Sequence, residues 1–170
     1  MRNTRLGAIA VIAMAAATSV SSGLPVASAG GAPRCTTGVL SLTHTRHDVG
    51  AGNGVEELVF TNRGSAGCVL GGFPGVVYVA GSGRQLGAAA DREGSTHGAI
   101  TLAPGERARA RLGFINNVSA VPGCYHPDQQ AQAVGLRVYP PGSTTAMFVR
   151  DLHPACKKAK VHLLHIEAVR

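Results

Sequence analysis

Apolar and polar residues alternate with a period of two along most of the chain after residue 38, which is typical of half-buried β-strands. The strictest alternation is in RARARLGF, residues 107–114. Similar stretches are VLSLTHT, EELVFTN, GVVYVA, AITLA, VGLRVYP, TAMFV and KVHLLHIEAV, with turn-forming residues between them. Residues 30–170 show no long helical period. The pattern therefore predicts an all-β fold, a single-domain antiparallel β-sandwich.

The glycine-rich run CVLGGFPGVVYV, residues 68–79, fits either a loop that cradles a ligand or a bend between strands. Pro74 cannot donate to a β-ladder, and Gly71, Gly72 and Gly75 permit positive φ on both sides of it. A phosphate-binding loop needs a following helix and a Lys-Ser or Lys-Thr pair, and the run has neither. The sequence therefore favours a strand-to-strand bend.

The N-terminus has the pattern of a secretory signal peptide. Arg2 and Arg5 precede an apolar run over residues 6–20, and the small residues ASA follow at 27–29. The apolar run is shorter than the roughly 20 residues that a membrane-spanning helix needs. We therefore expect residues 1–29 to be cleaved after Ala29. Residues 30–170 are then expected to form a monomeric secreted domain, extracellular or associated with the cell wall, without a membrane span.

The cysteines predict two disulfides, because an even number in an exported chain usually pairs. All four lie in the predicted mature domain: Cys35, Cys68, Cys124 and Cys156. Three pairings are possible. We favour Cys35 with Cys68 and Cys124 with Cys156, because each bond closes a medium loop within one half of the chain and stabilises by roughly 3–4 kcal/mol. A zinc site is disfavoured because C-x-x-C spacings are missing.

The expected mature domain is moderately basic, with 14 basic and 9 acidic residues. Arg107, Arg109 and Arg111 share one face of their strand at intervals of about 6.8 Å, and guanidinium groups bind phosphate or carboxylate in bidentate fashion. These arginines are candidate contacts to an anionic cell-wall polymer or an extracellular protein. The alternative is an exposed face on which acidic residues of neighbouring strands pair with them. A second basic segment either extends this surface or protects an edge strand from pairing, and comprises Lys157, Lys158 and Lys160.

Other features give less specific indications of function. The loop at Pro140, Pro141 and Gly142 is stiff, which suits a recognition loop but also a rigid hairpin connection. The absence of tryptophan disfavours surfaces that stack on carbohydrate or nucleic acid, so no specific nucleic-acid partner is expected. GSTHG, residues 94–98, lacks the nucleophile-elbow pattern, and no pair of carboxylates is evident. We therefore expect neither enzymatic activity nor a cofactor.

The histidines leave open an alternative function, a metal-binding protein or a hydrolase at the cell envelope. A methionine-rich copper site is excluded because Met147 is the only methionine after residue 29. In VLSLTHT, His44 falls on the same face as Leu40 and Leu42. His162 and His165 are three residues apart, which on a strand places them on opposite faces. The candidate metal ligands are His44, His47, His97, His126 and His153.

Several segments occur in an order that resembles a family of secreted or lipid-anchored proteins from high-GC Gram-positive (actinobacterial) species, the domain of unknown function 4232. These segments are LVFTNRGSAGCVLGGFPGVVYV, GRQLGAAADRE, ITLAPGERARARL, CYHP and GLRVYPPGSTTAMFV. The resemblance covers nearly all of the expected mature chain, and C-x-L-x-G-x-P-G-V and LRVYPPG are its most specific parts. It implies an extracellular β-sandwich of immunoglobulin-like character with no assigned activity and no defined catalytic residue. Unlike lipid-anchored members, the chain has no cysteine at the expected cleavage site.

Overall fold

The computed structural model describes residues 31–170, except for the side chains of residues 46–49. The predicted signal peptide and its cleavage after Ala29 lie outside this part of the chain. The described residues form a nearly all-β domain in which the only helices are two short 3-10 turns, η1 (Val118–Ala120) and η2 (Pro127–Gln129). Within this part of the chain, no helix has the length and apolar character needed to cross a membrane.

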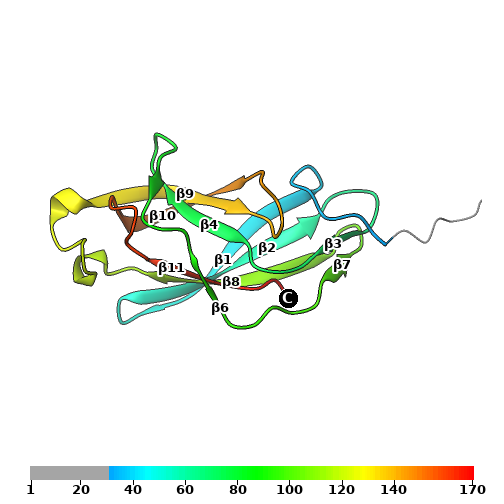
Figure 1. Cartoon of the computed structure of the whole chain (residues 1–170), viewed down its shortest axis with the longest axis horizontal. Helices are drawn as coiled ribbons and strands as arrows, with labels where there is room; N and C mark the ends of the chain where they lie inside the picture. The colour runs from blue at the N-terminus through cyan, green and yellow to red at the C-terminus, as the bar shows by residue number, and fades with distance from the viewer. Residues whose placement is uncertain (1–30) are drawn as a thin grey trace, which may run out of the picture. The chain divides into compact units, whose positions relative to one another are not determined.

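The strands form two main sheets, which lie as two layers in Figure 1. The first sheet has the order β1-β2-β8-β11-β6, with β1 (Leu40–Gly50), β2 (Asn53–Asn62), β8 (Arg107–Ile115), β11 (Leu164–Glu167) and β6 (Asp91–Glu93). The second has the order β10-β9-β4-β5, with β10 (Met147–Cys156), β9 (Gln130–Tyr139), β4 (Gly75–Val79) and β5 (Gln85–Leu86). A third sheet pairs β3 (Cys68–Leu70) with β7 (Ile100–Leu102). This confirms the predicted all-β class, and the two layers are compatible with the immunoglobulin-like character that the resemblance implied.

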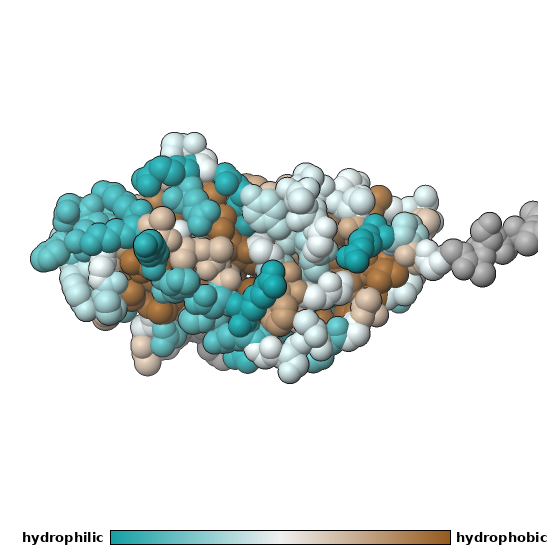
Figure 2. Space-filling model, viewed as in Figure 1, coloured by the Kyte–Doolittle hydropathy of each residue, from teal (hydrophilic) through white to brown (hydrophobic). Residues whose placement is uncertain are grey.

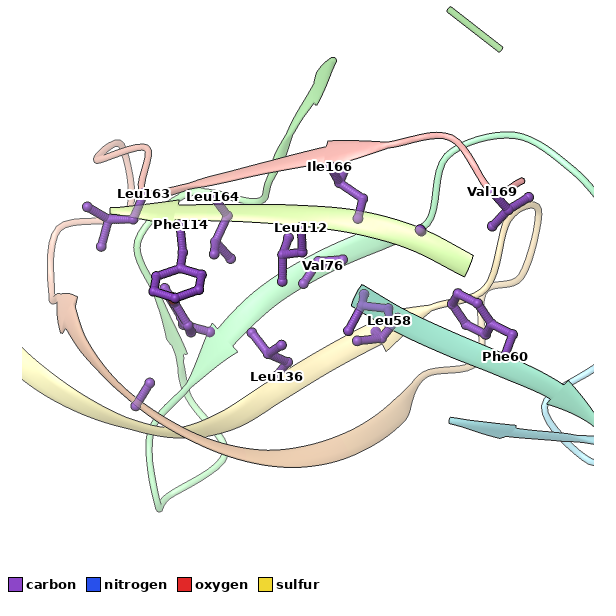
Figure 3. Close-up of a cluster of buried hydrophobic side chains, with 14 of the residues drawn as sticks. Leu58, Phe60, Val76, Leu112, Phe114, Leu136, Leu163, Leu164, Ile166 and Val169 are labelled. Atoms are coloured by element: carbon purple, nitrogen blue, oxygen red, sulfur yellow. The ribbon is translucent and has the colours of Figure 1, made fainter. Parts of the chain in front are cut away.

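The hydrophobic core lies between the two layers, where the inward residues of each strand meet. On β8 the alternation works as predicted: Ala108, Ala110, Leu112 and Phe114 are buried, whereas the intervening arginines are exposed. Figure 3 shows Leu112 and Phe114 extending toward the opposite layer, in the same space as Val76 and Leu136. Burying such a side chain stabilises the fold by roughly 1.5–3 kcal/mol, so the alternation decides which face of each sheet points inward.

The glycine-rich run is a bend, as its composition indicated. β3 ends at Leu70 and β4 begins at Gly75, so the residues between them connect two different sheets. Gly72 has φ 101°, which glycine adopts without strain. Its carbonyl oxygen accepts a hydrogen bond from the backbone N–H of Val169 at 3.0 Å. The run therefore connects the sheets and receives the C-terminal segment.

The structure differs from the sequence-based expectations at two places. Between GVVYVA and AITLA, where turn-forming residues were expected, lies β6, which pairs with β11 in parallel and so departs from an otherwise antiparallel pattern. The strand expected over TAMFV begins at Met147 and continues to Cys156, well beyond the apolar residues. Short edge strands and strands with buried polar side chains lack the apolar period by which strands are recognised.

Two disulfides tie loops to strands in the described domain, and no cysteine is free. Cys35 bonds to Cys68 at the start of β3, and Cys124 bonds to Cys156 at the end of β10. This is the pairing that we favoured from loop length. The second bond anchors the β10 end to the segment that carries η1 and η2.

Candidate functional site

The predicted row of arginines lies on the exposed face of the five-stranded sheet, on a central strand. β8 pairs with β2 on one side and β11 on the other. About half of the side-chain surface of Arg109 and Arg111 is exposed, 47% and 51% respectively. Arg109 Nη1 donates to Glu57 Oε2 at 2.8 Å, and Arg111 Nη1 lies 3.8 Å from Glu167 Oε1. Two of the three arginines therefore have acidic partners on neighbouring strands, as the alternative interpretation required.

A fourth guanidinium, which the sequence did not indicate, joins this face. Arg170 exchanges backbone hydrogen bonds with Arg109, and its side chain lies 3.7 Å from Glu57 and 3.3 Å from Glu167. We call Arg107, Arg109, Arg111, Arg170, Glu57 and Glu167 the charged face. Among the described side chains, no carboxylate pairs with Arg107. The charged face therefore has four cations and two anions, and two further carboxylates, Asp91 and Glu93 of β6, lie beside it along β11.

The second basic segment lies away from the charged face. Lys157, Lys158 and Lys160 are exposed and follow β10, which belongs to the other sheet. The ammonium group of Lys157 donates to the backbone carbonyl of Asp128 beside η2, at 2.8 Å. The lysines therefore form a separate basic patch next to the Cys124–Cys156 disulfide.

The candidate recognition loop connects β9 and β10, and its two prolines are buried. Gly142 is exposed, has φ 74° and lies close to the guanidinium of Arg34. The loop forms one wall of a hollow of about 300 Å³ whose lining includes Arg34, Thr36, Thr37, Ser143 and Thr144. Pro141 lines this hollow, and neither proline presents much surface to a partner because both are buried.

Two histidine–carboxylate pairs lie together inside the sandwich, where β1 and β10 approach each other. His44 Nδ1 on β1 lies 2.9 Å from Glu56 Oε2 on β2, and His153 Nε2 lies 2.6 Å from Asp151 Oδ2, both on β10. One ligand atom from each of His44, Glu56 and Asp151 lies within 4.8 Å of the others. We call these four residues the buried cluster.

Burial dominates the electrostatics of the buried cluster. Glu56, Asp151 and His153 are 1%, 4% and 2% exposed, whereas the side chain of His44 is 21% exposed at the rim. Burial raises the pKa of the Glu56 carboxyl, and the charge of Asp151 acts in the same direction, against the hydrogen bond from His44. The His153 ring is fixed by an edge-on contact with Phe114, with centroids 4.3 Å apart. The cluster is therefore a packed part of the core.

The remaining candidate histidines do not form a second cluster of three or more ligands within the described part of the chain. His162 Nδ1 lies 2.9 Å from Asp91, and His165 Nδ1 lies 3.4 Å from Glu93. The two histidines were expected on opposite faces of one strand. Because β11 begins only at Leu164, His162 precedes the strand, and both imidazoles lie near carboxylates of β6. His97 and His126 are exposed, and the side chain of His47 lies outside the described residues.

The sequence pattern did not indicate either carboxylate of the buried cluster. Glu56 has the same parity as Leu58 and Phe60 on β2, so extending their apolar row by one position would have placed it in the core. Asp151 and His153 alternate with exposed residues on β10, but there the exposed position between them is Leu152. In this part of β10 the polar residues face inward and Leu152 faces outward, so the alternation alone would have placed Asp151 and His153 on the surface.

The fold and these sites define a two-layered, disulfide-bonded β-domain with a charged sheet face and a buried histidine–carboxylate cluster. The chain belongs to the family described as a domain of unknown function (DUF4232), whose model matches residues 35–170. This confirms the family that the sequence motifs indicated. Neither a curated protein nor a solved structure has detectable similarity to the chain.

Proposed function

We propose that this domain is a secreted, non-catalytic binding module that acts at or outside the cell envelope and binds an anionic cell-wall polymer through the charged face. The observation that supports this proposal is the gathering of four guanidinium groups on one continuous sheet face. Arg107 and Arg109 are spaced by about 6.8 Å along the strand, which suits a ligand with repeating anionic groups.

The ion pairs of the charged face do not prevent such binding. Exposed ion pairs contribute only about 0–1 kcal/mol each, so a ligand anion replaces a glutamate at little cost. Glu57 is only 18% exposed and lies near both Arg109 and Arg170, which limits the freedom of the two guanidinium groups. Guanidinium groups held in this way lose less side-chain entropy on binding. The two glutamates therefore orient the guanidinium groups that a ligand would meet.

The test is retention of the purified protein on the cell-envelope fraction of its producer, at low salt and near 1 M salt. Replacing Arg107, Arg109 and Arg111 with serine should abolish retention at low salt. The matched control removes the same charge elsewhere, by replacing Lys157, Lys158 and Lys160 with serine, and should keep most of it. High salt should release the wild type, because the screening length falls to about 3 Å.

Three outcomes would contradict this proposal. Equal losses in the arginine and lysine variants would indicate attraction by net charge alone. Salt-resistant retention with one stoichiometric protein would make that protein the partner. No retention at either salt concentration would reject binding to the envelope.

A further inference from the structure

The buried cluster brings together side chains that metal ions use as ligands, from three strands and both sheets. His44 comes from β1, Glu56 from β2, and Asp151 with His153 from β10. We propose that His44, Glu56 and Asp151 bind a divalent transition-metal ion of the zinc type, and that His153 orients Asp151. This site is independent of the charged face, which lies on the outer side of the five-stranded sheet.

The donor atoms determine the class of metal. One imidazole nitrogen and two carboxylate oxygens form a mixed set that suits Zn²⁺ and similar divalent ions. Calcium and magnesium prefer oxygen ligands alone, and usually more of them. Thiolate ligands are not offered, since all four cysteines form disulfides. The cluster therefore favours a borderline metal ion over hard cations and over copper(I).

The separations are close to those of a bound ion. Zinc ligands at about 2.0–2.1 Å in a tetrahedral arrangement lie about 3.4 Å from one another. Here His44 Nδ1 and Glu56 Oε2 are 2.9 Å apart, and no pair among the three ligand atoms exceeds 4.8 Å. The adjustment to tetrahedral spacing is about an ångström, which side-chain rotation supplies. His44 is the ligand with the most freedom to move, because it lies at the rim.

Charge and orientation also fit a bound ion. A divalent cation balances two carboxylates when the imidazoles are neutral, which lowers the cost of burying Glu56 and Asp151. Asp151 Oδ2 lies 2.6 Å from His153 Nε2, so His153 holds the carboxylate that the ion would bind. Partners of this outer kind fix ligand orientation and raise affinity. Phe114 in turn holds the His153 ring in place.

The strand geometry at the cluster is irregular on both edge strands. On β1 a three-residue step, residues 46–49, opposes the two-residue step from Glu56 to Gly54 on β2. On β10 the three-residue step from Arg150 to His153 opposes two residues of β9. Bulges of this kind redirect side chains and are common beside functional sites. Both flank the cluster, one next to Glu56 and the other containing Asp151.

The experiment uses tag-free protein expressed as the full chain, stripped with chelator and titrated with Zn²⁺ in a calorimeter. Co²⁺ serves as a second probe, since ligand-field bands in visible absorption report its coordination. We expect one ion per chain. His153→Gln removes the residue that orients Asp151 and should weaken Zn²⁺ binding by roughly 10–100-fold. His44→Ala and Glu56→Gln remove ligands and should each weaken Zn²⁺ binding by more than this.

The matched control is His162→Ala, because it removes an exposed imidazole that also lies 2.9 Å from a carboxylate. It should bind Zn²⁺ like the wild type. Circular dichroism and a count of free thiols confirm that each variant is folded and oxidised. Glu56→Gln preserves side-chain volume, so its loss of binding reports the ligand rather than the packing.

The proposal is rejected if the wild type binds no Zn²⁺ under these conditions. It is also rejected if His44→Ala and Glu56→Gln bind as tightly as the wild type, or if His162→Ala is the variant that loses the ion. In each of these cases the buried cluster is an ion-paired network within the core.

Discussion

Replacing Gly54 with alanine should disturb the core directly beside the buried cluster. Gly54 lies on β2 opposite Phe114 of β8, and its neighbour two positions on is Glu56. A β-carbon at residue 54 would come within 2.6 and 2.9 Å of two atoms of the Phe114 ring. Ordinary carbon contacts are about 3.5–4.0 Å, and Phe114 Cζ would be closer still, so the ring would have to retreat by more than about an ångström. The ring also packs against His153, which restricts this movement.

Two effects of opposite sign determine the magnitude. Overpacking a buried site costs about 1–3 kcal/mol, whereas alanine gains about 0.4–1 kcal/mol over glycine by restricting the unfolded chain. The net expectation is a loss of about 1–2 kcal/mol in the free energy of unfolding. For a domain of this size, that lowers Tm by roughly 3–8 °C. Calorimetry and urea unfolding of the oxidised protein measure it.

The matched control for this prediction is Gly98→Ala, because a β-carbon there would meet nothing within 4 Å. This variant should be neutral or slightly stabilised. Adding Phe114→Leu to Gly54→Ala should relieve the clash, so the double variant should be less destabilised than the sum of the two single changes. Additive losses, or a Gly54→Ala variant as stable as the wild type, would refute the proposed contact.

Three further predictions concern the disulfides and the charged groups. Replacing Cys124 and Cys156 together with serine should lower the free energy of unfolding by about 3.7 kcal/mol on the chain-entropy model, given their sequence separation of 32 residues, and urea unfolding measures this. Because burial raises the pKa of the Glu56 carboxyl, this carboxyl stays protonated to a higher pH in the folded state than in the unfolded state. Stability should therefore fall as pH rises above the ordinary value of 4.5, and Glu56→Gln, compared by unfolding in chelator across this range, should remove that contribution. Arg109→Gln should change stability by less than about 1 kcal/mol, because its pair with Glu57 is exposed, and a larger loss would show that the charged face is structural.

The sequence predicted the fold class because most strands follow one simple rule. On β8, apolar residues and arginines alternate with a period of two. Only the apolar face can be buried, so the orientation of the strand follows from its sequence. The bend at Gly72 could also be predicted, since proline and glycine restrict the backbone locally. The pairing of β6 with β11 could not, because a strand of three polar residues carries no period and is fixed by its neighbours.

The candidate sites were only partly predictable, for a related reason. The arginine row lies on one strand and could be predicted from its alternation. Its ion pairs could not, because Glu57, Glu167 and Arg170 come beside it only through the pairing of β8 with its neighbours. The buried cluster combines three strands. Glu56 continues an apolar row on β2, whereas Asp151 lies on a strand whose large apolar residues, Phe148 and Leu152, face outward. Propensity and periodicity describe single segments, so a site assembled across sheets needs the topology as well.

The register of β10 places two residues of the buried cluster in the core and two large apolar residues at the surface. Phe148 and Leu152 are 58% and 52% exposed, while Asp151 and His153 point inward, and Figure 2 shows apolar patches among the hydrophilic residues of this domain. A slip of one residue would exchange the two faces. It would bury Phe148 and Leu152, but it would also turn Val149 and Ala155 out of the core. The observed register instead aligns Val149 with Leu136 in the core, and the disulfide at Cys156 anchors the end of the strand. The core contacts of Val149 and Ala155 and the disulfide therefore hold the register that places Asp151 and His153 inside the sandwich.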